Sequence, residues 1–77
     1  MLIEVFGPGC AKCQTLEKHA KEAAEQSGGN HQVVKISDYA VMVARGILST
    51  PALALDGQLK SQGKVVSTDE ILSLLKA

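Results

Sequence analysis

The two cysteines of this 77-residue chain, Cys10 and Cys13, lie within four consecutive positions, where one predicted element gives way to another. An apolar run over residues 1–6 predicts a buried strand. A Gly-Pro-Gly turn follows over residues 7–9, and a helical pattern begins at about Cys10. Any sulfur chemistry of the protein must therefore take place at this one corner of the fold.

The composition excludes several classes of function. Eight basic and eight acidic residues cancel, and neither sign is clustered, which argues against a nucleic-acid or membrane-surface partner. No apolar run approaches the length of a membrane span, about 18 residues. Met1 leads directly into fold-forming sequence, so we expect one domain over residues 1–77 in the cytoplasm. A disulfide between Cys10 and Cys13 would close too short a loop to stabilise the fold much, so it is expected to be made and broken.

Hydrophobic periodicity and turn signals predict seven elements in the order β-α-β-α-β-β-α. Residues of opposite charge spaced four positions apart predict the solvent-exposed face of the first helix. An Asp-Gly pair at residues 56–57 predicts a hairpin, and the first β-α-β unit predicts two parallel strands. The fold class is therefore α/β with a mixed four-stranded sheet. The expected ranges are strand 1–6, helix 10–27, strand 31–36, helix 38–45, strand 52–55, strand 58–62, and a last helix capped by Ser67 with Glu70.

Three apolar residues of the short second helix are expected to face the core, because apolar residues at helical spacing are more often core than partner surface. They are Tyr39, Met42 and Val43. The two histidines, His19 and His31, are expected on the surface.

The two cysteines are expected to differ in role. Cys10 lies at the start of the first helix, where unpaired backbone N–H groups and the helix dipole favour an anion and lower the pKa of a thiol. Cys13 follows about one turn later on the apolar stripe, so it should be the more buried of the two. These positions predict Cys10 as nucleophile and Cys13 as resolving thiol. Lys12 either stabilises the Cys10 thiolate or is a solvated lysine of little effect.

A groove for a partner is expected around the nucleophile. Gly7, Pro8, Gly9 and Ala11 leave Cys10 without bulky neighbours, so a partner backbone could approach it.

A second signal is Thr50-Pro51, directly before the strand expected at 52–55. Proline cannot donate to a strand ladder, so it must lie at the start of that strand. The residues alone favour the trans form of this peptide bond.

Gly-x-Gly-Cys-x-x-Cys after a first strand, followed about forty residues later by Thr50-Pro51-Ala-Leu, resembles the thioredoxin superfamily. The whole chain is similar to the small thioredoxin- or glutaredoxin-like redox-active disulfide proteins of archaea and bacteria. The resemblance implies a three-layer α/β/α fold and a thiol–disulfide oxidoreductase that reduces or exchanges disulfides of partner proteins. It implies no bound cofactor and an external reductase. A monomer is the default expectation. The resemblance also implies that Pro51 is cis, lies against the cysteine pair and keeps metal away, while Thr50 offers backbone hydrogen bonds to the partner.

The chain departs from the family pattern at several positions. The dipeptide between the cysteines is Ala-Lys, and the chain has no tryptophan. No acid is identified beneath Cys13, and Glu4 is expected to be merely tolerated near the end of the sheet. A single Gly63 stands where glutaredoxins have a Gly-Gly pair, and Asp69 is expected in the first turn of a helix. Glutathione binding is therefore not expected.

Two other functions remain open at this point. A pair of thiolates can hold Cu(I) or contribute to a zinc site, so the chain could be a soft-metal carrier. Such carriers usually have a methionine before the first cysteine and a different order of elements, and structural zinc needs four ligands. The chain could also be a docking domain whose disulfide is incidental.

Overall fold

The computed structural model describes residues 1–76 and contains the seven elements in the predicted order. Their bounds are β1 (Leu2–Phe6), α1 (Ala11–Ser27), β2 (Gln32–Ile36), α2 (Tyr39–Ala44), β3 (Ala52–Leu55), β4 (Gln58–Gln62) and α3 (Thr68–Lys76). Among these helices, none is long and apolar enough to cross a membrane.

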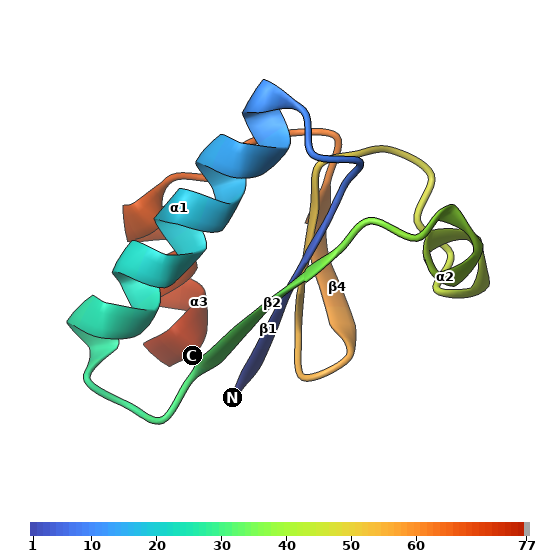
Figure 1. Ribbon diagram of the computed structural model, residues 1–77. Coiled ribbons are helices and arrows are strands. Elements are labelled where there is room, and N and C mark those ends of the chain that lie inside the picture. Colours follow the sequence, from blue (N-terminus) through green and yellow to red (C-terminus); the bar gives the residue numbers. More distant parts are fainter. Residues whose placement is uncertain (77) are drawn as a thin grey trace.

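The four strands form one mixed sheet in the order β2-β1-β3-β4. The inner strand β1 pairs parallel with β2 and antiparallel with β3. Parallel pairing follows from the long connection through α1, which returns the chain to the same end of the sheet (Figure 1). The predicted hairpin joins β3 to β4, and both of its turn residues, Asp56 and Gly57, have positive φ, as a tight two-residue turn requires.

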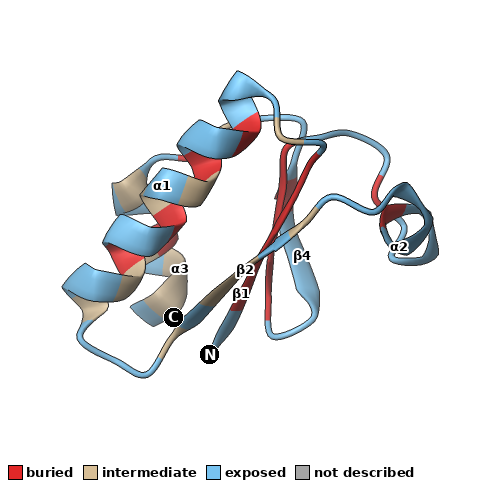
Figure 2. Cartoon of the chain, in the orientation of Figure 1, coloured by how far each residue is buried: buried red, intermediate tan, exposed pale blue. Residues whose placement is uncertain are grey.

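The helices cover the two faces of the sheet unequally. Helices α1 and α3 pack side by side on one face, and α2 lies on the other (Figure 1). Successive side chains of β1 point to opposite faces of the sheet. Ile3 and Val5 pack in the larger core with α1 and α3. Phe6 packs in a smaller core with Met42 of α2. The three-layer α/β/α arrangement is thus confirmed, and Figure 2 shows the buried residues concentrated on the central strands and the inner side of α1.

Helix ends follow the sequence signals. Cys10 is the N-cap of α1, and Gly28 ends that helix in the left-handed conformation with φ 70°. Asp38 caps α2, accepting a hydrogen bond from a backbone N–H at 2.9 Å. Ser67 caps α3 by accepting from the Glu70 N–H at 3.1 Å. These caps fix the starting point of each helix, and with it the position of Cys10.

The prediction for the inner face of α2 is wrong for two of its three residues. Met42 is 2% exposed, but Tyr39 is 64% and Val43 is 75% exposed. Tyr39 and Val43 are four residues apart and share one side of the helix, so they turn away from the sheet together. Because α2 has only six residues, it offers the core one side chain of this set.

The histidines are also less exposed than predicted, since both are half-buried. The Nδ1 atom of His19 lies 2.9 Å from the carbonyl oxygen of Val66, which ties α1 to the segment before α3. His31 packs over Gly29, and its Nδ1 is buried without a hydrogen-bond partner among residues 1–76. His19 therefore joins two segments by a polar contact, whereas His31 acts as a packing group.

Glu4 is an organised part of the fold, and the expectation that it is merely tolerated is wrong. It lies inside β1, is 7% exposed, and accepts two hydrogen bonds from the guanidinium of Arg45 at 2.8 and 3.0 Å. The same guanidinium lies 5.3 Å from the centre of the Phe6 ring. This bidentate pair joins the central strand to the end of α2 on the face that has the smaller core.

We predict that Arg45→Met lowers the free energy of unfolding, seen as a lower midpoint in urea denaturation. The substitution keeps an aliphatic stem but leaves the Glu4 carboxylate buried without its partner, and the partial exposure of Arg45 reduces the cost below that of a fully buried pair. Lys21→Met is the matched control, because Lys21 pairs with Glu17 at a largely exposed site and its loss should cost less than about 0.5 kcal/mol. Equal effects of the two substitutions would contradict this role for Glu4 and Arg45.

Candidate functional site

Three chain segments meet at one end of the sheet. The parallel strands β1 and β2 both finish there, and the antiparallel β3 begins there. The backbone N–H of Gly7 donates to the Ile36 carbonyl at 2.9 Å, which holds the end of β1 against β2. Thr50, before β3, also lies close to Gly7, since its Cβ is 4.0 Å from the position that a Cβ of Gly7 would occupy. The N-terminus of α1, which follows the turn after β1, therefore starts at this end of the sheet.

The two thiols face each other across the first turn of α1. Cys10 is exposed and Cys13 is buried, as the helical pattern predicted, and neither takes part in a disulfide. Their sulfur atoms are 2.7 Å apart, and the backbone N–H of Cys13 donates to the Cys10 sulfur at 3.4 Å. This is the geometry of a side-chain N-cap in which the capping atom is sulfur. The Cys10 sulfur is therefore exposed to solvent, and the Cys13 sulfur lies buried next to it.

The environment separates the acidities of the two thiols. Hydrogen bonding from the Cys13 thiol, followed by that from the Cys13 backbone N–H, lowers the pKa of Cys10. Burial, followed by the hydrogen bond to Cys10, raises the pKa of Cys13. The pair thus holds its negative charge on the exposed sulfur and its proton on the buried one.

Lys12 acts on this pair through its backbone. Its backbone N–H is one of the smaller contributions that lower the Cys10 pKa, behind both hydrogen bonds from Cys13. The sequence had left open whether the lysine ammonium stabilises the thiolate. The structure assigns the main stabilisation to Cys13 and to the N-terminal turn of the helix.

The space that a side chain of Gly7 would occupy is filled by the side chain of Cys13. A Cβ atom at this position would overlap the Cys13 sulfur and lie 3.0 Å from the Cys13 Cβ. Gly7 is buried, so the expectation that it lines the groove for a partner is not met. Its lack of a side chain instead makes room for the buried thiol.

The other expected groove residues surround Cys10 at the surface. Pro8 and Ala11 are exposed, and Gly9 is half-buried with φ 93°, a conformation that favours glycine. No bulky side chain of this turn covers the Cys10 sulfur. Cys10 and its neighbours Pro8 and Ala11 are therefore exposed at the surface, with Gly9 half-buried between them.

The Thr50–Pro51 peptide bond is cis in the structure. Pro51 is buried, and its carbonyl oxygen accepts a hydrogen bond from the Gly63 N–H at 2.9 Å. Thr50 is exposed, and its backbone groups take part in none of the hydrogen bonds between loop residues of the described chain. The Thr50 backbone, which lies close to Gly7, therefore keeps an unused donor and acceptor.

Gln62 is a supporting residue that the sequence did not reveal. Its side-chain oxygen accepts from the backbone N–H groups of Leu48 and Ser49 at 2.9 and 3.3 Å. These bonds tie the loop before Pro51 to the end of β4. A glutamine at the end of an exposed strand has no distinctive sequence signal, so only the fold identifies this role.

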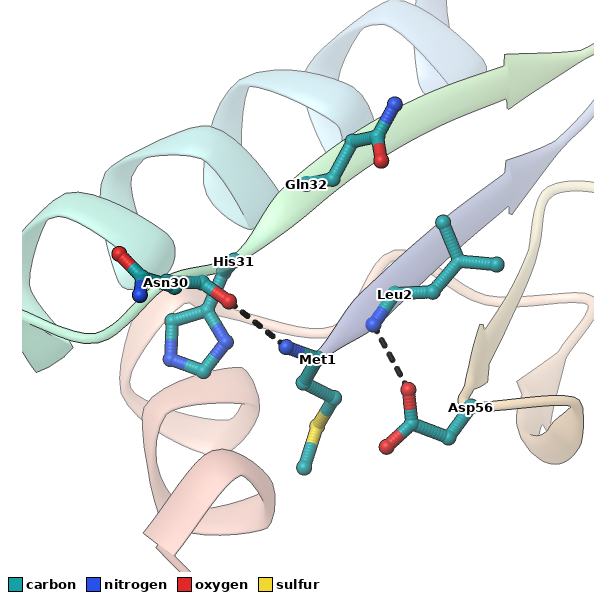
Figure 3. Close-up of a pocket in the computed structure, with 6 residues that line it drawn as sticks. All are labelled: Met1, Leu2, Asn30, His31, Gln32 and Asp56. Atoms are coloured by element: carbon teal, nitrogen blue, oxygen red, sulfur yellow. Dashed lines mark hydrogen bonds between the residues drawn. The ribbon is translucent and has the colours of Figure 1, made fainter.

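A cavity elsewhere in the structure has neither cysteine in its lining. It has a volume of about 540 Å³ and opens at the start of β1, whereas the cysteines follow the end of that strand. Figure 3 shows the Leu2 N–H donating to the Asp56 carboxylate there, at 2.7 Å. The lining residues are Met1, Leu2, Asn30, His31, Gln32 and Asp56. Within residues 1–76 no three side chains of the usual metal-ligating types come together.

An exposed helix-capping thiol, a buried thiol behind it and a proline at the start of the adjacent strand define a dithiol protein of thioredoxin-like architecture. Comparison with known proteins agrees with this class. A family model described as "Thioredoxin domain" matches residues 1–76. The chain therefore belongs to the thioredoxin family, whose members are thiol–disulfide oxidoreductases.

Two archaeal relatives described as thioredoxins are similar over nearly their whole length. The one from Methanothermobacter thermautotrophicus is 41% identical over 75 residues, covering 97% of each chain. The one from Methanocaldococcus jannaschii is 34% identical over 77 residues, covering 100% of this chain and 88% of its own. A solved structure described as that of a malarial protein has the same fold, with a TM-score of 0.73 at 15% identity over 97% of this chain and 92% of its own.

We predict that alkylation of the reduced protein separates the two thiols by pH. Cys10 should react fast and reach half its maximal rate below the ordinary thiol pKa of about 8.5, because its pKa is lowered and its sulfur is exposed. Cys13 should react slowly and only as the pH rises above that value, because burial raises its pKa. Peptide mass spectrometry after short iodoacetamide pulses at each pH measures both curves. Equal rates with the same midpoint would contradict the assigned asymmetry.

We predict that Gly7→Ala displaces the Cys13 sulfur and lowers the free energy of unfolding by about 1–3 kcal/mol, as overpacking of a filled site does. The alkylation rate of Cys13 should rise relative to that of Cys10, because the sulfur can no longer occupy its buried position. Gly29→Ala is the matched control, since a Cβ there meets only the end of the His31 side chain, which can move. An unchanged alkylation ratio in Gly7→Ala would show that Gly7 does not position Cys13.

Proposed function

We propose that the protein reduces disulfides of partner proteins, with Cys10 as nucleophile and Cys13 as resolving thiol. The observation that supports the proposal is the difference in exposure and in pKa between the two thiols. The exposed sulfur has the lowered pKa, and the buried sulfur with the raised pKa is 2.7 Å away. Thiol–disulfide exchange needs a thiolate that is accessible and a second thiol within reach of it, and this pair offers both.

In the first step, the Cys10 thiolate attacks one sulfur of the partner disulfide. The partner S–S bond breaks, a bond forms between Cys10 and the attacked sulfur, and the other partner sulfur leaves as a thiolate that takes up a proton. Cys10 loses the hydrogen bond that the Cys13 thiol donated to its thiolate, because its sulfur is no longer charged. The mixed disulfide therefore removes one of the contacts that separated the two pKa values.

In the second step, Cys13 gives up its proton and its thiolate attacks the Cys10 sulfur. The mixed disulfide breaks, the second partner sulfur leaves and is protonated, and Cys10 and Cys13 become joined. The partner has gained two electrons and two protons. The pair has lost two electrons and the Cys13 proton, and the second proton comes from solvent. An external dithiol or flavin-type reductase must then reduce Cys10–Cys13 before the next cycle.

The backbone beside the pair supports docking of an extended partner segment. Thr50 is exposed, and its backbone donor and acceptor are unused by the loops of the described chain. A partner strand could pair with these groups by the strand-addition mode that many peptide-binding proteins use. Gln62 and Gly63 would hold the loop in place while the partner binds.

We predict that Cys13→Ser traps a mixed disulfide with a disulfide-bonded test peptide, while Cys10→Ser traps none. The first variant keeps the nucleophile but lacks the thiol that completes the reaction, so the covalent intermediate should accumulate. Intact-protein mass spectrometry measures the adduct, and dithiothreitol should release it. Peptide reduction by the unsubstituted protein, driven by dithiothreitol, should exceed that of either variant by at least about 100-fold.

Two results would overturn the proposal. One is trapping by Cys10→Ser in place of Cys13→Ser, which would reverse the roles. The other is unchanged peptide reduction in the double variant Cys10→Ser, Cys13→Ser, which would favour a docking domain whose cysteines are incidental.

A further inference from the structure

Lys35 reaches the turn that precedes Cys10, although the two residues are far apart in the sequence. It is the second-last residue of β2, at the edge of the sheet, and it is exposed. Its Nζ atom lies 3.6 Å from the position that a Cβ of Gly9 would occupy. Because Gly9 has no side chain, nothing of that residue separates the ammonium group from the surface next to Cys10.

This ammonium group is not neutralised by the fold. Within residues 1–76 the ion pairs are Lys21 with Glu17 and Arg45 with Glu4, so Lys35 has no carboxylate partner there. Lys35 is also absent from the contacts that lower the Cys10 pKa, which come from Cys13 and from backbone N–H groups. Its charge is therefore available to a molecule that approaches Cys10 from outside.

The sheet order places Lys35 across the nucleophile from Thr50. Strand β1 leads to Cys10 and lies between β2, which carries Lys35, and β3, which Thr50 precedes. A partner segment that contacts both the Thr50 backbone and the Cys10 sulfur is thereby directed toward β2. A side chain of that segment just beyond the attacked cysteine would come to the ammonium of Lys35.

We propose that Lys35 selects partners that present a carboxylate next to the disulfide that Cys10 attacks. This inference rests on the proposed function and adds the charge of the preferred substrate. The carboxylate can belong to an acidic side chain of a protein or to a small disulfide such as oxidised glutathione. Opposite charges at such a rim raise the rate of productive encounter and suppress partners of the wrong sign.

The test uses three cystine peptides of one sequence in which the residues flanking the attacked cysteine are Asp, Asn or Lys. For the unsubstituted protein at low ionic strength, the second-order rate constant should be highest for the Asp peptide and lowest for the Lys peptide. Lys35→Glu should lower the rate for the Asp peptide about three- to tenfold and raise that for the Lys peptide. The Asn peptide should change less than about twofold, and ~0.5 M salt should reduce all of these differences.

Lys60→Glu is the matched control. It makes the same change of charge on β4, the opposite edge strand of the sheet, and should leave the order of the three peptides intact. Oxidised glutathione and cystamine, one anionic and one cationic small disulfide, test the second source of the carboxylate. If Lys35→Glu lowers the rate with the Asp peptide, the preferred substrate is an acidic segment of a protein. If it lowers the rate with oxidised glutathione alone, the preferred substrate is a small anionic disulfide. Either result supports the proposal.

The proposal is overturned if Lys35→Glu and Lys60→Glu affect every substrate equally. This failure is distinct from failure of the proposed function, in which the unsubstituted protein would reduce none of the three peptides. The Asn peptide separates the two cases, because its reduction requires the cysteine pair but no charge on the substrate.

Discussion

The strand β1 is the constraint on which the rest of the structure depends. It lies inside the sheet, pairs with β2 on one side and β3 on the other, and sends alternate side chains into two separate cores. Its last residue leads into the turn that places Cys10 at the start of α1. Ile3 and Val5 pack against the buried side of α1 in the larger core. Because this core is close-packed, the packing fixes the position of the helix and its cysteines relative to the sheet.

The chemistry of the site comes from unequal burial of two identical groups. The apolar stripe of α1 takes Cys13 inward, where Gly7 leaves space for its sulfur, while the capping position keeps Cys10 outside. Burial then raises the pKa of the Cys13 thiol. The hydrogen bonds from the Cys13 thiol and from the Cys13 backbone N–H lower the pKa of Cys10. A proton and a negative charge are thus distributed between two sulfurs, and no carboxylate of residues 1–76 is among the causes of the two pKa shifts. Glu4, the buried acid of β1, lies on the opposite face of the sheet and is occupied by Arg45.

Much of the fold was predictable because its signals are local. Caps, glycine stops and the Asp56–Gly57 turn each act within a few residues, so all seven elements and their order were correct. The errors concern which side chains the assembled elements bury. A short helix such as α2 can turn either side to the sheet, so its periodicity could not show that Met42 alone would be buried.

The sequence by itself determined the position of the cysteine pair at a helix start, the exposure of Cys10 relative to Cys13, and the proline at the entry to β3. These properties follow from spacing along the chain and from the fixed geometry of a helix turn. Only the tertiary structure decided that Gly7 accommodates the Cys13 sulfur, that Glu4 finds Arg45 across 41 residues, and that Lys35 reaches the turn before Cys10. The reason is physical: such contacts join residues on different elements, and their distances are set by how the strands order themselves and by which faces the helices cover.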